Sequence, residues 1–186
     1  MRKVFAQTLL VLVVSSVALA QEPSPQGAVS PARTEAEKAI RVSLYEMAVA
    51  NQTGDAKTFK KYAAQRTLKF YDALIEELFK NQKIKEQMGR AKVTDGDSLI
   101  DLTYRGVAQR TSATPRSKIE ENARGYAAVR LVFVSDTEAK GDNEAGTPRV
   151  VKEADTWKVD MTETLKKGLL ASLPLTAESK AKLEKF

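Results

Sequence analysis

The sequence predicts an α+β fold, with N-terminal helices packed on a curved antiparallel sheet and a short helical tail at the C-terminus. Apolar residues recur at helical spacing through the first half of the chain. Alternating apolar residues, which are typical of strands, are concentrated between residues 126 and 161. Because helices and strands occupy separate parts of the chain, this order favours a helical layer on an antiparallel sheet.

The first 20 residues have the three parts of a cleavable secretory signal. Arg2 and Lys3 give a positive start, Leu9–Val14 is apolar throughout, and Ala18 and Ala20 supply the small side chains before the cleavage point. The apolar segment that ends at Ala20 is shorter than the about 20 residues of a spanning helix. We therefore expect a signal peptide at residues 1–20, export to the periplasm or the exterior, and no membrane span after cleavage.

The composition excludes several kinds of chemistry. The chain has no cysteine and no histidine. It therefore has no disulfide, no lipid-anchoring thiol, no thiolate metal site and no Ser-His-Asp or Cys-His catalytic set. The net charge of +6 is spread over 30 basic and 24 acidic residues. This mild and mixed charge does not indicate a nucleic-acid partner.

Residues 21–33 hold three of the six prolines and are expected to form a flexible linker. Thr34 and Glu37 have the spacing of a capping box, which predicts a helix that begins at Thr34 and ends near Gly54. Asp55 is expected to cap a second helix.

The remaining elements follow from apolar spacing and from polar breaks. A longer helix is predicted over residues 68–91, and a helical turn capped at Asp97 runs toward Gln109. The later elements are a loop over residues 111–116, a further edge strand at 117–122, a strand at 126–134, a polar connection at 135–148, strands at 149–153 and 156–161 that pair across Ala154-Asp155, and a tail at 163–186 with two short helices broken at Pro174.

Three segments resemble the nuclear-transport-factor-2-like superfamily. The strand 126–134 and the later strand Val150–Asp160, with Lys152-Glu153 and Trp157-Lys158-Val159-Asp160, are similar to the closing strands of its exported members. The helix at 39–50, followed by Gln52–Ala56, is similar to the first helix and Gly-Asp turn. The superfamily members that the chain resembles include lumazine-binding-like and SnoaL-like domains. The resemblance implies a domain of this kind over residues 34–162.

That resemblance implies a cystatin-like roll, in which a bent sheet curls against helices and forms a cone with a cavity at its open end. Cones of this superfamily host small isomerases, cyclases and dehydratases, and also binding or assembly modules. The fold alone therefore leaves the function open.

Five residues are candidates for lining such a cavity. Trp157 is the only tryptophan and is expected on the core face of its strand. Asp160 and Arg130 are charged residues on strands; a carboxylate in an apolar cone would have a raised pKa and could act as a base, and the alternative is a solvated face or a structural ion pair. Tyr45 and Tyr126 are candidate pocket hydroxyls or core residues.

The first functional hypothesis is a non-catalytic exported domain that binds a small apolar ligand or a protein of the cell envelope. The alternative is a small isomerase or lyase that uses Asp160 as its general base. A homodimer through the sheet is a further expectation. No cofactor and no metal are expected, because the aspartates from Asp95 to Asp101 lack the later ligands of a calcium loop.

Overall fold

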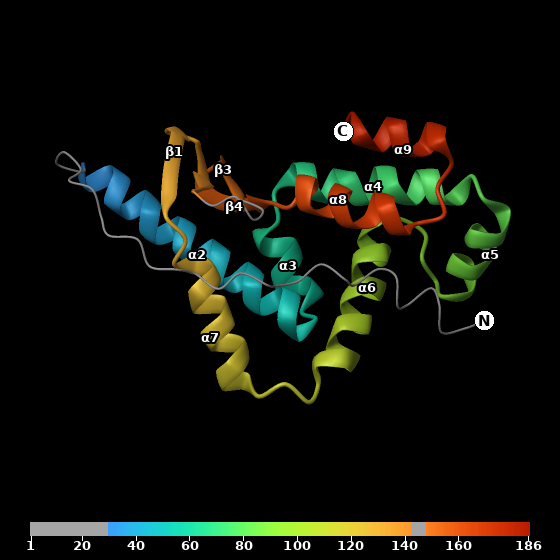
Figure 1. Ribbon diagram of the computed structural model, residues 1–186, viewed down its shortest axis with the longest axis horizontal. Helices are drawn as coiled ribbons and strands as arrows, with labels where there is room; N and C mark the ends of the chain where they lie inside the picture. Colours follow the sequence, from blue (N-terminus) through green and yellow to red (C-terminus); the bar gives the residue numbers. More distant parts are fainter. Residues whose placement is uncertain (1–29, 143–147) are drawn as a thin grey trace.

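The computed structural model describes residues 30–142 and 148–186, which form eight helices and one four-stranded sheet (Figure 1). The predicted α+β class, with its antiparallel sheet, is confirmed. The signal peptide (residues 1–20) and residues 21–29 of the linker lie outside the described residues. The helices are α2 (Pro31–Thr53), α3 (Ala56–Tyr62), α4 (Gln65–Phe79), α5 (Gln82–Arg90), α6 (Gly96–Thr111), α7 (Arg116–Ala127), α8 (Thr162–Ser172) and α9 (Ala177–Glu184). The strands are β1 (Leu131–Ser135), β2 (Glu138–Gly141), β3 (Arg149–Glu153) and β4 (Thr156–Asp160).

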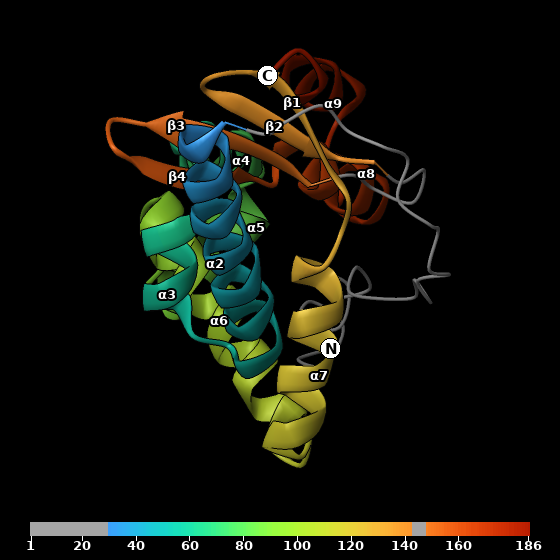
Figure 2. The same ribbon diagram turned by 90° about the vertical axis from the view of Figure 1, so that its left-hand side faces the viewer.

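The sheet has the order β1-β2-β3-β4, and every neighbouring pair is antiparallel. The β3–β4 hairpin turns at Ala154-Asp155, as predicted. Register partners Val150 and Val159 are fully buried. Figure 2 shows the sheet lying across one end of α2. The Ser43 hydroxyl on that helix donates a hydrogen bond to the Trp157 carbonyl at 2.7 Å, which fixes α2 beneath β4.

Helix α2 begins at Pro31, three residues before the predicted start at Thr34. The Ser30 hydroxyl caps it by accepting a hydrogen bond from the Arg33 N–H. A proline in the first turn costs nothing, because its missing N–H would have no helical partner there. The helix ends at Thr53, and the φ of 73° at Gly54 gives the left-handed cap predicted for that glycine.

The single helix predicted over residues 68–91 is wrong, because the chain forms two helices there. Helix α4 ends at Phe79 and α5 begins at Gln82. The Asn81 side chain accepts hydrogen bonds from the Lys83 and Ile84 N–H groups and so caps α5. Both helices contribute buried residues to one core, which explains why the apolar spacing continues across the break.

The edge strand predicted at 117–122 is also wrong, and so is the start of the strand predicted at 126–134. Both segments belong to α7, which runs to Ala127. Ile119, Ala123 and Ala127 are its buried residues, four positions apart, and the helix packs against α2. The connection predicted at 135–148 contains strand β2, which pairs with β1 and β3.

Helices α8 and α9 form the predicted tail, with the break at Pro174 confirmed, and they lie beside α4 (Figure 1). Their buried apolar side chains are Leu169, Leu170 and Leu183, so the tail belongs to the common core. The Phe186 ring meets the Phe70 ring edge-on at a centroid distance of 5.8 Å. None of the described helices is long and apolar enough to cross a membrane.

Candidate functional site

Asp160 lies at the end of β4, where the chain leaves the sheet for α8. Trp157 and Val159 alternate toward the core, and only 3% of the Asp160 side chain is exposed. Burying an ionised carboxylate is unfavourable unless it is paired and hydrogen-bonded. The contacts of this one side chain therefore decide what the site can do.

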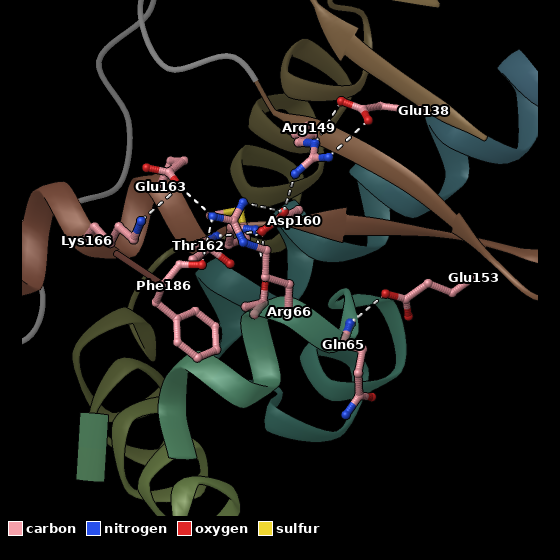
Figure 3. A network of polar contacts seen from close by, with 12 residues as sticks. Gln65, Arg66, Glu138, Arg149, Glu153, Asp160, Thr162, Glu163, Lys166 and Phe186 are labelled. Atoms are coloured by element: carbon pink, nitrogen blue, oxygen red, sulfur yellow. Dashed lines mark hydrogen bonds and ion pairs between the residues drawn. The ribbon is translucent and has the colours of Figure 1, made fainter. Parts of the chain in front are cut away.

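Both carboxylate oxygens of Asp160 are engaged, as Figure 3 shows. Oδ2 accepts from the Arg66 guanidinium at 3.4 Å and from the Arg149 guanidinium at 3.3 Å. Oδ1 accepts from the Thr67 hydroxyl at 3.3 Å and from the Thr162 N–H at 3.0 Å. These partners come from helix α4, strand β3 and helix α8, so the carboxylate joins three elements.

The two arginines hold further acceptors around this centre. Arg149 makes a two-pronged contact with Glu138 on β2, at 2.8 and 3.0 Å. Arg66 donates to the Glu163 carboxylate at 3.0 Å and to the main-chain oxygen of Phe186 at 3.2 Å. We call Arg66, Glu138, Arg149, Asp160 and Glu163 the Asp160 cluster. It contains two guanidinium groups and three carboxylates.

A neighbouring contact ties helix α4 to the same sheet. Ala64 occupies the N-cap position of α4 and has no side chain that could cap the helix. The Glu153 carboxylate, from the end of β3, accepts the Gln65 N–H at 2.8 Å (Figure 3). A negative charge is favourable at this end of a helix. Strand β3 thus provides the cap that the local sequence lacks.

The pKa of Asp160 lies below its usual value. Burial raises this pKa, but the contacts from Thr162 and the charges of Arg66 and Arg149 lower it more. The Arg149 contact likewise lowers the pKa of Glu138. A general base at neutral pH needs a pKa near the working pH and a free oxygen. The contacts of Asp160 instead stabilise its ionised carboxylate and occupy both of its oxygens.

Four residues of this site were not predicted from the sequence: Arg66, Thr67, Arg149 and Glu138. A signal for one of them was present, because a hairpin that turns at Ala154-Asp155 places Arg149 directly opposite Asp160. Arg66 and Thr67 precede Asp160 by more than 90 positions, and no spacing rule connects them. The raised pKa expected for a carboxylate in an apolar cone does not apply to Asp160, because two guanidinium groups face it.

The other candidate residues lie apart from Asp160. Trp157 is buried, with its ring edge-on to Phe133 at 6.2 Å. Tyr45 and Tyr126 are half-buried against the core, and burial raises the pKa of Tyr126 to about 12. Arg130 is exposed and pairs with Asp142 at 3.6 Å. Within residues 30–142 and 148–186, no hydrogen bond, ion pair or ring contact joins any two of the five candidates.

A small pocket of about 160 Å³ lies between α4, α5 and the α8–α9 connection. Leu78, Ile84 and Leu175 line it together with Glu77, whose side chain is fully buried. Lys80 and Lys182 each reach a Glu77 oxygen at 2.7 Å. Hydrogen bonds from Lys182, Lys80 and Ser179 lower the pKa of Glu77 to about 2. The charges lining this pocket are thus already matched.

Asp95 caps helix α6, two residues before the position predicted for the cap. Its carboxylate accepts the Ser98 N–H, and the Ser98 hydroxyl accepts the Asp95 N–H in return. The part of the chain that the structure describes contains no group of three acidic side chains placed to hold a metal ion.

Comparison of the chain with protein-family models, with curated proteins and with solved structures returns no match.

Proposed function

We propose that this chain is an exported, non-catalytic domain that binds a protein partner in the cell envelope through the open edge of its sheet. The observation that carries the proposal is strand β1. Within the described chain it pairs with β2 alone, and its residues Val132 and Val134 are 36% and 56% exposed. An open edge offers unpaired backbone groups to an added strand, and apolar side chains on the same strand add burial.

The Asp160 cluster supports a non-catalytic role. An isomerase or lyase that uses Asp160 as base would need an oxygen free to take a proton from its substrate. Both oxygens are occupied, and the pKa of the carboxyl is lowered. The contacts fit a cluster that holds β4 to α4 and α8.

The pocket beside Glu77 is a poor site for a small apolar ligand. Its volume of about 160 Å³ is below the about 300 Å³ at which ligand pockets begin. A buried carboxylate with two lysine contacts also places charged groups beside it. The nuclear-transport-factor-2-like relationship and the cone-shaped roll are parts of this proposal, and the order of helices before an antiparallel sheet supports them.

The test compares matched valine-to-lysine variants on two exposed surfaces. Val134→Lys places a charge on β1, and Val42→Lys places the same charge on α2, where Val42 is 53% exposed. The mature chain is purified from its own envelope fraction and weighed by native mass spectrometry. We expect bound protein on the wild type and on Val42→Lys, and none on Val134→Lys. An apo monomer, or a retained small molecule without protein, would overturn the proposal.

Export has a separate test in the full chain. N-terminal sequencing of the protein from the envelope fraction is expected to begin at Gln21. A chain that keeps Met1 and stays in the cytoplasm would contradict this part of the proposal.

A further inference from the structure

Strand β1 has a geometry that restricts what can pair with it. The Asp142 N–H donates to the Arg130 carbonyl at 2.7 Å, so the Arg130 carbonyl faces β2. Backbone groups alternate in direction along an antiparallel strand. The N–H and C=O groups of Leu131 and Phe133 therefore point away from β2, toward the open edge.

The far end of β1 is closed to regular pairing. The register with β2 shifts between Phe133 and Ser135, which marks a bulge at Val134. A bulge interrupts the ladder and twists the strand away from a flat edge. The segment available for regular pairing is thus Leu131–Phe133, with Val132 at its centre.

The charges at the two ends of β1 favour a second copy of the same chain. Leu131–Ser135 holds no charged residue and no proline, whereas Arg130 precedes it and Asp136 follows it. In an antiparallel pair of two identical strands, the basic end of each strand lies beside the acidic end of the other. Opposite charges on neighbouring strands are favourable, and long side chains also reach diagonal neighbours.

We propose that two copies of this chain pair through β1 in antiparallel orientation, with the twofold axis at Val132. This rests on the proposed function and names its partner. Leu131 then lies opposite Phe133 of the partner subunit, and every outward-facing N–H and C=O of these two residues is paired. Val132 lies opposite Val132 of the partner subunit as a pair without direct hydrogen bonds, the arrangement in which side chains are closest. The two sheets become one continuous sheet.

This contact is confined to a strand edge, so dimer formation depends on concentration. Sedimentation velocity of the mature chain, at rising concentration from the range used for native mass spectrometry upward, is expected to show a monomer–dimer equilibrium. Hydrogen exchange at the Leu131 and Phe133 amides is expected to slow over the same range. A monomer at all concentrations would overturn self-pairing.

Cysteine cross-linking tests the register, and the natural chain contributes no cysteine of its own. In Val132→Cys the two introduced cysteines face each other across the twofold axis. Their Cα atoms are about 4.5 Å apart, a distance that a disulfide can span. Val134→Cys is the matched control, because it lies on the same face and two residues from the axis. Mild oxidation is expected to link Val132→Cys dimers and not Val134→Cys. Equal linking of both variants would overturn the register.

Charge exchange tests the orientation. Arg130→Asp alone and Asp136→Arg alone each place like charges together and are expected to weaken the dimer about tenfold, whereas the double variant regains it. Failure of the double variant to regain it would overturn the antiparallel arrangement. If the chain stays monomeric while the envelope preparation still shows a different protein that Val134→Lys releases, self-pairing fails and the proposed function stands. An unbound monomer in both experiments would overturn self-pairing and the proposed function alike.

Discussion

At the scale of single residues, the buried Asp160 carboxylate accepts hydrogen bonds from four groups. It is nearly inaccessible to water, whereas the Arg66 and Arg149 side chains are 34% and 41% exposed. Removing one member of a buried pair leaves its partners without compensation. Because water can reach both arginines, part of that loss is recovered by solvation.

Asp160→Asn is expected to lower the free energy of unfolding by about 1–3 kcal/mol, since the amide keeps the shape and loses the charge. Urea denaturation at pH 7 measures it. Asp155→Asn makes the same chemical change in the exposed β3–β4 turn and should stay within about 0.5 kcal/mol of the wild type. Equal urea midpoints for the two variants would remove the structural role given to the Asp160 cluster.

The lowered pKa of Glu77 predicts the direction in which the stability of the fold changes with pH. Its pKa falls from 4.5 to about 2 on folding, so the unfolded chain takes up this proton first as the pH falls. The stabilisation is complete above pH 4.5 and disappears as the pH falls through about 2. After allowance for the half-exposed lysines, it amounts to about 1–2 kcal/mol.

The difference in unfolding free energy between the wild type and Glu77→Gln is therefore expected to shrink from pH 5 to pH 2, as the folded pKa of about 2 is approached. Urea titrations at several pH values measure this difference. Glu76→Gln is the control, because the neighbouring Glu76 side chain is 70% exposed and 3.9 Å from Lys182. If the difference in unfolding free energy between the wild type and Glu77→Gln stayed constant across this pH range, the lowered pKa of Glu77 in the folded chain would be contradicted.

At the scale of elements, two glycines predict opposite effects of the same substitution. A Cβ on Gly54 would lie 2.3 Å from the Tyr104 carbonyl oxygen, at a positive φ of 73°. A Cβ on Gly89, inside α5, would meet nothing within 4 Å. The first position requires glycine, and the second does not.

Gly54→Ala is expected to destabilise the fold by about 2 kcal/mol or more, through left-handed strain and the clash with α6. Gly89→Ala is expected to stabilise it by about 0.5–1 kcal/mol, because alanine loses less chain entropy in a helix. Thermal melts followed by circular dichroism measure both. Shifts of the same sign would show that the packing between α2 and α6 differs from the one described.

Elements with strong local signals could be predicted from the sequence. Asp55 caps α3, and Trp157 and Val159 alternate with polar residues along β4. Helix α7 was missed because two of its three buried residues are alanines, which give a weak apolar stripe, and because its last residues join the run Tyr126–Val134. Strand β2 was missed because Glu138–Gly141 has little strand propensity of its own.

The Asp160 cluster was less predictable than the elements that carry it. A hairpin register could have paired Arg149 with Asp160, since both lie on one local unit. The approach of Arg66 depends on how α4 docks against the sheet, which no nearby residue determines. The position of Asp160 on its strand could therefore be predicted, but the partners that keep its carboxylate ionised could not.

At the scale of the whole molecule, the two edges of the sheet differ. The Ala64 N–H donates to the Val159 carbonyl at 2.9 Å, so the connection before α4 covers the β4 edge. On the other side, β1 has no such cover within the described residues, and α7 before it packs mainly on α2. Helix α7 and strands β1 and β2 thus have fewer packing partners than the elements at the centre of the molecule.

Native-state hydrogen exchange followed by mass spectrometry is expected to show this gradient. Amides of α7 should open at a lower free energy than those of α4, because α4 contacts α5, α6, α8, α9 and β4. The measurement is made at low protein concentration, so that association does not add protection. Equal protection of α7 and α4 would contradict the gradient.

The position of Asp160 between strand and helix also has a calorimetric consequence. Its carboxylate contacts Arg66 and Thr67 in α4 and the first residue of α8 at once. The terminal helices cannot detach without exposing that charge and the leucines beneath them. Heating is therefore expected to melt the sheet, α4 and the terminal helices in a single endotherm, rather than releasing the last two helices as an early, separate step.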